Sequence, residues 1–177
     1  MASILLRPLV EADFRHLIGW MDSREALIQW AGPTQFTFPL TSDQLHAYLR
    51  GCAGDRPERL AYTAFTEDHV VCGHIELGAI SRENETASVC RVLVAPDARG
   101  RGLSLPMVQE VLRIGFSDLH LRRIDLRVYG FNTAAIRCYE KAGFVREGML
   151  RKSQKVGQQY WDSVLMAILR EEWECMV

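Results

Sequence analysis

The fold is decided by the segment Val92-Leu93-Val94-Ala95-Pro96-Asp97-Ala98-Arg99-Gly100-Arg101-Gly102-Leu103-Ser104. An apolar strand ends at Pro96, a turn rich in glycine and arginine follows, and a helix begins near Leu103. Glycine lets the backbone adopt positive φ and approach a ligand closely. The first N–H groups of a helix lack partners within it, and the helix dipole favours an anion there. Because Arg99 and Arg101 can add charge-assisted hydrogen bonds, the segment predicts a pyrophosphate-binding turn, although a purely structural turn fits the same residues.

Two other phosphate-binding motifs are absent from the sequence. No GxxxxGK[ST] pattern occurs, which excludes the phosphate loop of nucleoside-triphosphate hydrolases. No GxGxxG pattern occurs with an acidic residue about 20 positions further on, which excludes a Rossmann dinucleotide site. A pyrophosphate bound by this turn therefore belongs to a ligand of another class.

Apolar periodicity predicts strands and helices on both sides of this segment. The expected strands are Ser3–Arg7, Leu60–Thr66, Val70–Leu77, Thr86–Ala95, Arg123–Val128, Phe144–Gly148 and Trp161–Leu169. The expected helices are Glu11–Met21, Thr41–Leu49, Leu103–Phe116 and a short helix from Asn132 or Thr133 to Ala142. Residues 22–40 are expected to be irregular, because Gly32-Pro33 interrupts an aromatic stretch. The fold class is therefore α+β, an α/β sandwich with a mixed, mostly antiparallel sheet of about six to seven strands and about four flanking helices.

Charge is distributed unevenly along a chain whose total charge is close to zero. The 177 residues include 21 Lys and Arg and 22 Asp and Glu, which gives a net charge of −1. The length suits a single domain over residues 1–177, and the near-zero charge argues against a general nucleic-acid binder. Residues 91–155, however, hold 13 basic and 6 acidic side chains. This excess favours a polyanionic ligand, and solvated surface charge is the simpler alternative.

Cysteine, histidine and apolar patterns indicate the environment of the chain. The five cysteines are odd in number and form no CxxC pair, which favours reduced thiols and a cytoplasmic location. The five histidines form no HExxH motif and no cluster with cysteine, so no metal is expected. The N-terminal apolar run is too short for a signal peptide, and no apolar run approaches the length of a membrane span. No membrane association is therefore expected.

Two spaced motifs resemble those of the GNAT N-acetyltransferase superfamily. Its acetyl-CoA signature R/Q-x-x-G-x-G/A is similar to Arg99-Gly100-Arg101-Gly102-Leu103-Ser104, with Ser104 where glycine or alanine is usual. Its N-x-x-A-x-x-x-Y-x-x-x-G-F helix is similar to Asn132-Thr133-Ala134-Ala135-Ile136-Arg137-Cys138-Tyr139-Glu140-Lys141-Ala142-Gly143-Phe144. The tail from Glu147 to Met166 resembles the branch that includes ribosomal-protein-alanine and polyamine acetyltransferases. The resemblance covers nearly the whole chain, and the order of the expected strands fits this fold.

The resemblance implies a binding role for each part of these motifs. Backbone groups around Val92, Leu93 and Val94 are expected to bind the pantetheine arm of acetyl-CoA in the manner of an added strand. The pyrophosphate would be held by the turn, which consists of Arg99, Gly100, Arg101, Gly102, Leu103 and Ser104. Asn132 would hydrogen-bond the cofactor, and a plain helix N-cap is the alternative role for its side chain.

Two side chains are expected to be catalytic. The resemblance implies that Tyr139 protonates the CoA thiolate as it leaves, and a core aromatic is its alternative role. Glu76 is expected to accept the proton of the attacking amine, because it lies on an apolar strand, on one face with Cys72 and His74. A surface carboxylate at a strand end is the alternative for Glu76, and Glu85, His74 or a chain of waters could serve as the base instead. Two possible ligands, His74 and Glu76, are too few for a metal site.

The resemblance implies an enzyme, an acetyl-CoA-dependent N-acetyltransferase. Direct attack by a primary amine in a ternary complex is expected, since no cysteine has an evident activating neighbour. The acceptor stays open between a protein N-terminus, a polyamine and a small-molecule amine. The stretch Trp30–Phe38 and residues 150–160 are expected to flank the acceptor cleft, with core packing the alternative for the aromatic side chains Trp30, Phe36 and Phe38.

Two further expectations concern function and assembly. A non-catalytic module of the same fold, which binds acyl-CoA as a sensor or interaction domain, is the alternative function. The intact tyrosine and glycine–arginine turn make this alternative the weaker one. A homodimer joined through sheet edges fits the expected fold.

Overall fold

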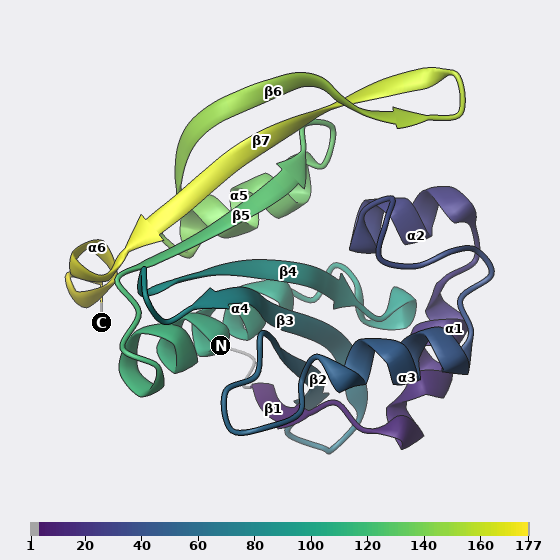
Figure 1. Cartoon of the computed structure of the whole chain (residues 1–177), viewed down its shortest axis with the longest axis horizontal. Helices are drawn as coiled ribbons and strands as arrows, with labels where there is room; N and C mark the ends of the chain where they lie inside the picture. The colour runs from purple at the N-terminus through teal and green to yellow at the C-terminus, as the bar shows by residue number, and fades with distance from the viewer. Residues whose placement is uncertain (1–3, 177) are drawn as a thin grey trace.

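A single mixed β-sheet runs through the protein (Figure 1). The computed structural model describes residues 4–176, so Ser3 of the first expected strand lies outside the described residues. The strands are β1 (Ile4–Pro8), β2 (Leu60–Thr66), β3 (Val71–Ser81), β4 (Thr86–Val94), β5 (Arg123–Tyr129), β6 (Val145–Val156) and β7 (Gln159–Leu169). Their order is β1-β2-β3-β4-β5-β7-β6, and β4 and β5 form the one parallel pair among the described strands. The predicted mixed, mostly antiparallel α+β fold is confirmed.

Six α-helices occur in the described part of the chain, two more than the sequence predicts. They are α1 (Phe14–Trp20), α2 (Arg24–Ala31), α3 (Ser42–Arg50), α4 (Ser104–Arg113), α5 (Thr133–Lys141) and α6 (Arg170–Glu174). The unexpected α2 lies in the segment predicted to be irregular. It begins at the N-cap Ser23, whose hydroxyl accepts a hydrogen bond from the amide of Ala26, and ends at Gly32 with φ +76°. The Gly-Pro interruption therefore ends a short helix, and α6 is a single five-residue helix near the C-terminus.

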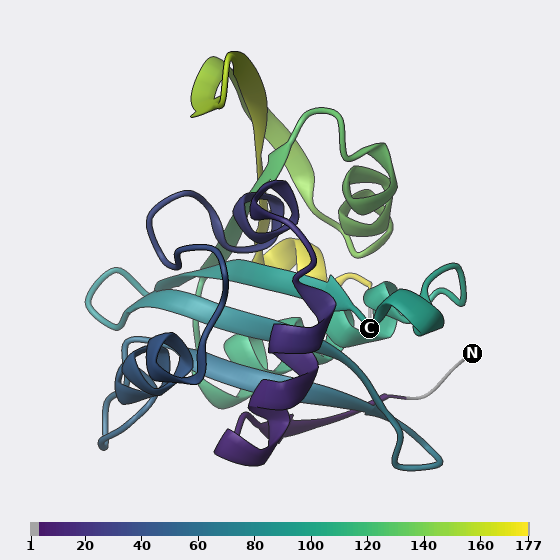
Figure 2. The same ribbon diagram turned by 90° about the vertical axis from the view of Figure 1, so that its right-hand side faces the viewer.

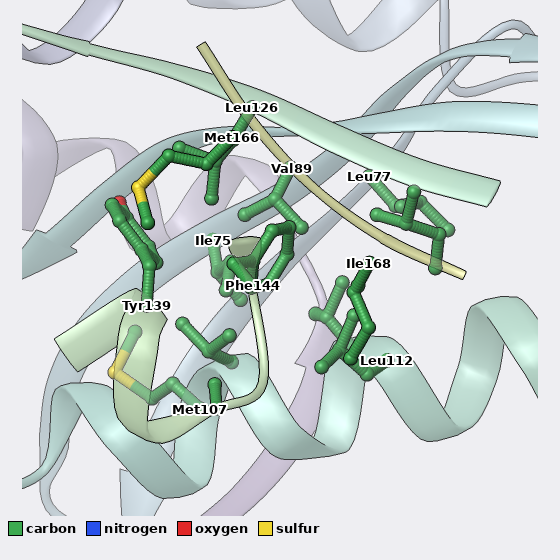
Figure 3. Packing of buried hydrophobic residues seen from close by; sticks show 14 of the residues in the cluster. Ile75, Leu77, Val89, Met107, Leu112, Leu126, Tyr139, Phe144, Met166 and Ile168 are labelled. Atoms are coloured by element: carbon green, nitrogen blue, oxygen red, sulfur yellow. The ribbon is translucent and has the colours of Figure 1, made fainter. Parts of the chain in front are cut away.

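The helices form two layers on opposite faces of the sheet (Figures 1 and 2). On one face, α4 and α5 pack through a large core that includes Met107, Ile136 and Tyr139. Figure 3 shows part of this core around Ile75, with strand side chains above α4. On the other face, α1, α2 and α3 pack through a second core of more than ten side chains. We call these the α4–α5 face and the α1–α3 face.

The sheet divides where its two parallel strands separate. Residues 86–89 of β4 pair with residues 123–126 of β5, and no further. Beyond this point β4 continues along β3 to Val94, whereas β5 continues along β7 to Tyr129. A parallel pair requires a long crossover connection, which α4 supplies here. The separation leaves backbone groups of both strands unpaired near the middle of the molecule, beside the start of α4.

Two strands are longer than the sequence predicts. The expected strand over Phe144–Gly148 is β6, which reaches Val156. Nearly all of its side chains are exposed along an edge of the sheet, so no apolar period marks its length. β3 similarly continues past Leu77 to Ser81. In contrast β7, which pairs with a strand on each side, has the buried apolar run that its sequence predicts.

Candidate functional site

A cleft of about 1030 Å³ occupies the gap between β4 and β5 and opens on both faces of the sheet. On the α4–α5 face its wall includes the glycine–arginine turn and one side of α5. On the α1–α3 face its wall includes α2 and the polar side of β5. The cleft therefore gives two molecules access to the same point from opposite sides of the sheet.

The glycine–arginine turn has the geometry of an anion site. Gly100 and Gly102 have φ values of +77° and +75°, which side chains rarely adopt, and a Cβ on either would meet no protein atom within 4 Å. The turn leads into α4, whose N-terminal position Leu103 provides no side-chain cap. The first amides of α4 thus lack a capping side chain, at the helix end that favours an anion.

The structure places most of the expected cofactor-binding residues in one wall. Among the expected residues, those that line the cleft are Val92, Leu93, Val94, Arg99, Gly100, Gly102, Leu103, Ser104 and Asn132. Arg101 is exposed and lies outside this wall. Asn132 is the N-cap of α5, where its Oδ1 accepts a hydrogen bond from the amide of Ala135 at 3.2 Å. Asn132 therefore has the N-cap role and also lines the cleft.

Tyr139 lies on α5 with its ring in the core and one edge in the cleft wall. The side chain is 8% exposed, and its ring contacts Phe144 at a centroid distance of 5.8 Å. Figure 3 shows its hydroxyl beside Met166 and away from Met107. The hydroxyl has no hydrogen-bond partner among residues 4–176. Burial, reinforced by Cys138 and Cys90, raises the pKa of this phenol well above its ordinary value. The phenol is therefore protonated near neutral pH.

Glu76 lies outside the cleft wall, in contrast to the position expected for a base. Its side chain is 2% exposed, and one oxygen, Oε2, lies 2.6 Å from Nη1 of Arg91. The same Oε2 accepts a hydrogen bond from the hydroxyl of Tyr48 on α3. The carboxylate is thus neither a surface group nor a group open to the cleft.

The neighbours of Glu76 differ partly from those expected. His74 is buried beside it, and burial lowers the pKa of this imidazole to about 3, so the ring is neutral. Its Nε2 lies 3.4 Å from the hydroxyl of Tyr48. Cys72 instead packs in the core of the α4–α5 face with Ile75, because the pairing of β2 with β3 is irregular at this end. His74 and Glu76 therefore lie on the same face of β3 as expected, whereas Cys72 does not.

Two features of the cleft were not found from the sequence. Ser88 of β4 donates a hydrogen bond to Asp125 of β5 at 2.5 Å, where the two strands are about to separate. The alternation of polar and apolar residues along β5 is the signal that could have located Asp125. The second feature is Arg91, whose backbone carbonyl accepts a hydrogen bond from the indole of Trp30 at 2.8 Å. The Ser88–Asp125 pair and Arg91 all line the cleft.

The aromatic side chains of the stretch Trp30–Phe38 differ in position, because some line the cleft and some pack in the core. Trp30 is 7% exposed, stacks on the buried Phe36 at 5.5 Å and still lines the cleft. Phe36 belongs to the core of the α1–α3 face. Phe38 is exposed and does not line the cleft. From residues 150–160, Ser153 and Gln154 reach the cleft wall.

The thiols of the cleft are poor nucleophiles. Burial, with Glu76 nearby, raises the pKa of Cys90 to about 11, and burial also raises the pKa of Cys138. Both thiols line the cleft, and both are protonated near neutral pH. A cysteine nucleophile is therefore not favoured.

Residues 4–176 contain neither a cluster of metal-ligating side chains nor a helix able to span a membrane. No group of three or more His, Cys, Asp or Glu side chains there has the arrangement of a metal site. None of the helices in this range has the length and hydropathy needed to cross a membrane.

Comparisons with known proteins agree with this geometry. The uncharacterized SPbeta prophage-derived N-acetyltransferase YokL of Bacillus subtilis is 33% identical over 66% of each chain. The spermidine N(1)-acetyltransferase of Vibrio cholerae is 27% identical over 97% of this chain and 96% of its own. A crystal structure of the spermidine N-acetyltransferase from Vibrio cholerae in complex with CoA and spermine superimposes with a TM-score of 0.85. It is 25% identical and covers 97% of this chain and 98% of that one.

The family is shown by a sequence model that covers most of the chain. The model of the acetyltransferase (GNAT) domain matches residues 3–145. This range includes most of the cleft wall, the glycine–arginine turn and the helix of Tyr139. The chain therefore belongs to the GNAT acetyltransferase family and is an acetyl-CoA-dependent N-acetyltransferase.

Proposed function

We propose that the chain acetylates the primary amine of a small polycation, with polyamines the favoured class, by direct attack on acetyl-CoA. The amine nitrogen forms a bond to the thioester carbon, the bond from that carbon to sulfur breaks, and the nitrogen loses a proton. CoA enters from the α4–α5 face and the amine from the α1–α3 face, because the cleft opens on both.

At the cofactor end of the cleft, backbone groups and side chains make different contacts with CoA. Amides of residues 100–104 hold the pyrophosphate, with Arg99 adding positive charge, while Arg101 contributes from outside the wall. The unpaired edge of β4 at residues 92–94 binds the pantetheine arm as an added strand. The side-chain amide of Asn132 donates to the cofactor while its oxygen caps α5.

The observation that best supports transfer is the free hydroxyl of Tyr139 in the cleft wall. Because burial keeps this phenol protonated, it can donate its proton to the CoA sulfur as the carbon–sulfur bond breaks. The high pKa of the two cleft thiols supports direct attack by the amine.

We assign acceptance of the amine proton to Asp125, directly or through water. Its side chain is 42% exposed, lines the cleft and lies where β4 and β5 separate. It points to the face opposite Leu126, which packs in the α4–α5 core with Tyr139. The proton donor and acceptor are thus on opposite faces. The alternative base, Glu76, is sealed from the cleft by Arg91 and Tyr48.

The charges of the cleft wall favour a cationic acceptor. Its carboxylates are Asp22, Asp125 and Glu147, and its arginines are Arg91, Arg99, Arg123 and Arg127. Arg91 pairs with Glu76, Arg123 pairs with Glu147, and Arg99 lies at the pyrophosphate end. Arg123 also lies 3.9 Å from Asp125, so the acceptor end of the described wall has three carboxylates, Asp22, Asp125 and Glu147, against two arginines, Arg123 and Arg127. Similarity to spermidine N-acetyltransferases supports a polyamine in particular.

The test is CoA thiol release with a set of amines. Spermidine, butylamine, kanamycin and a short peptide with an N-terminal alanine are each added with acetyl-CoA. Spermidine is expected to give a kcat/KM about tenfold above butylamine, because two additional charges meet the cleft carboxylates. Equal values for spermidine and butylamine, or a preference for the peptide, would remove the polycation from the proposal. Binding of acetyl-CoA without release of thiol by any amine would favour the non-catalytic alternative.

Location and assembly are proposed on separate grounds. We infer a cytoplasmic location from five free cysteines, of which Cys175 is exposed. A homodimer through the sheet edge at β6 is supported by the exposed apolar side chains Val145, Met149 and Leu150 on that strand. Light scattering on the purified protein would give the mass of one chain or two and so decide the dimer.

A further inference from the structure

β4 contains a bulge at the mouth of the gap between β4 and β5. Arg91 and Val92 both lie opposite Ile75 of β3, so that two residues face one. Arg91 has φ +50°, a left-handed conformation that is strained for any residue with a side chain. Such a conformation persists only where the surrounding structure holds it, so the contacts of Arg91 need explanation.

Arg91 is held at both its backbone and its side chain. Its carbonyl accepts a hydrogen bond from Nε1 of Trp30 on α2 at 2.8 Å. Its guanidinium lies 2.6 Å from Glu76 and donates to Oε1 of Gln35 at 2.9 Å. The side chain of Arg91 is 13% exposed, so these bonds are largely shielded from water. The three partners come from α2, from β3 and from the segment between α2 and α3.

Glu76 is itself fixed by its surroundings. The hydroxyl of Tyr48 donates to the same oxygen that binds Arg91, and the guanidinium lies 5.4 Å from the centre of the Tyr48 ring. The other oxygen faces the backbone of Gly78, where a Cβ would clash with it. Neither oxygen is therefore directed into the cleft.

We propose that Glu76 is a positioning residue, which acts through Arg91 to hold the bulge of β4 in the geometry that transfer requires. Trp30 holds the same peptide unit from the other side. The bulge directly precedes residues 92–94, so the clamp formed by Trp30, Gln35, Tyr48, Glu76 and Arg91 fixes the start of that edge. This inference rests on the proposed function in one respect, the placement of the pantetheine arm and thioester along β4.

The clamp has a consequence for catalysis because small displacements matter there. A shift of about 1 Å in a bound reactant costs about 100-fold in rate. The clamp residues lie on the α1–α3 face, whereas the cofactor turn and Tyr139 lie on the other. Loss of the clamp should therefore lower the rate of transfer while the turn continues to bind CoA.

The first test is Glu76→Gln, assayed for kcat over a range of pH and for binding of CoA. Glutamine keeps the size of the side chain and removes the charge that holds Arg91. We expect kcat to fall about tenfold or more, with CoA affinity within threefold and the pH profile unchanged in shape. Loss of one limb of the pH profile would instead identify Glu76 as the general base and overturn the proposal.

A second variant keeps the test decisive if Glu76→Gln folds poorly. Trp30→Phe removes the indole N–H that binds the carbonyl of Arg91 and keeps a ring to stack on Phe36. It should lower kcat in the same direction and speed hydrogen exchange at the amides of residues 91–94. A kcat within twofold of wild type together with unchanged exchange would show that the bulge needs no clamp.

A matched control separates positioning from general loss of stability. Asp13 is also a buried carboxylate of the α1–α3 face, and it binds Arg7 at 2.9 Å and the hydroxyl of Thr63 at 2.7 Å. Asp13→Asn is expected to destabilise the fold and leave kcat within twofold of wild type. A fall in kcat equal to that of Glu76→Gln would attribute both effects to stability and overturn the proposal.

Discussion

The two faces of the sheet form the two sides of one cleft, and they are built in different ways. The side proposed to bind CoA, called the cofactor side, comes from short continuous segments, residues 92–104 and the helix that follows Asn132. The opposite side depends on contacts between residues far apart in the chain. Trp30 and Arg91 are 61 positions apart, and Tyr48 and Glu76 are 28 apart. A local motif therefore defines one side, whereas only tertiary packing defines the other.

The difference follows from the groups that each side uses. Binding of a pyrophosphate relies on backbone amides, glycines with positive φ and a helix N-terminus, all of which lie within a few residues. A buried ion pair such as that of Glu76 with Arg91 depends on where β3 and β4 meet α2, α3 and the segment between these helices. Changes on the cofactor side should thus act on CoA binding or on its leaving sulfur, and changes on the other side on alignment.

The largest expected effect comes from Tyr139→Phe. Loss of the proton donor should lower kcat about 100-fold or more, because a positioned acid contributes about that much. Affinity for acetyl-CoA, measured by calorimetry, should stay within threefold, since the ring still packs against Phe144. The matched control is Tyr62→Phe, at a half-buried tyrosine of β2 that does not line the cleft. Turnover of Tyr139→Phe within threefold of wild type would remove Tyr139 from the acid role.

A smaller effect is expected from Gly102→Ala. The added Cβ strains a turn at φ +75° and projects into the open space where the pyrophosphate is proposed to bind. Affinity for acetyl-CoA should fall about tenfold, with little change in kcat at saturation. Gly54→Ala is the matched control, because Gly54 has φ +91° and open space around it, yet lies outside the cleft. If both variants weaken binding equally, backbone strain and not contact with CoA explains the result.

The smallest effect concerns acid stability and the buried imidazole of His74. Its pKa of about 3 lies below the ordinary value of 6.5, so the unfolded chain takes up a proton that the folded chain excludes. Stability is complete above pH 6.5 and falls as the pH decreases from there toward 3. Between pH 7 and pH 5.5, protonation of this residue in the unfolded chain should lower the free energy of unfolding by about 1 kcal/mol. Urea unfolding of His74→Asn should lose that part of the pH dependence.

The control for this measurement is a histidine at the surface. His46 of α3 is partly exposed, with 43% of its side chain accessible, lies 3.5 Å from Glu11 and is on the same face of the sheet. His46→Asn should retain the part of the pH dependence that His74→Asn loses. If His74→Asn and wild type lose the same stability between pH 7 and pH 5.5, the α1–α3 face admits water or a charge that the structure does not show.

Much of the fold could be predicted from local patterns. Thr41 and Asn132 cap α3 and α5 as their side chains suggest, and β2 has the predicted limits. Local patterns fail where packing decides the structure. The helix α2 is short and ends at a Gly-Pro pair typical of loops, and the edge strand β6 has no apolar period because both its faces are exposed.

The candidate site likewise has parts that local sequence patterns predict and parts that only tertiary packing decides. The residues that the cofactor motif predicts line the cleft, with the exception of Arg101, and their binding of CoA stays a prediction. Glu76 was expected to face a substrate, but its burial depends on Arg91 and Tyr48, and no spacing in the sequence connects these three residues. Asp125 is one of several charged residues that alternate with apolar ones on β5, and its position beside Ser88, where β4 and β5 separate, is visible only in the structure.

The most direct test of direct transfer is the timing of thiol release. The protein is mixed with an equal amount of acetyl-CoA, and free thiol and intact protein mass are recorded before and after addition of spermidine. We predict no thiol release and no change in mass before the amine, and afterwards equal amounts of thiol and acetylated spermidine. One thiol per chain released before the amine, with an acetyl group on the protein, would contradict the account.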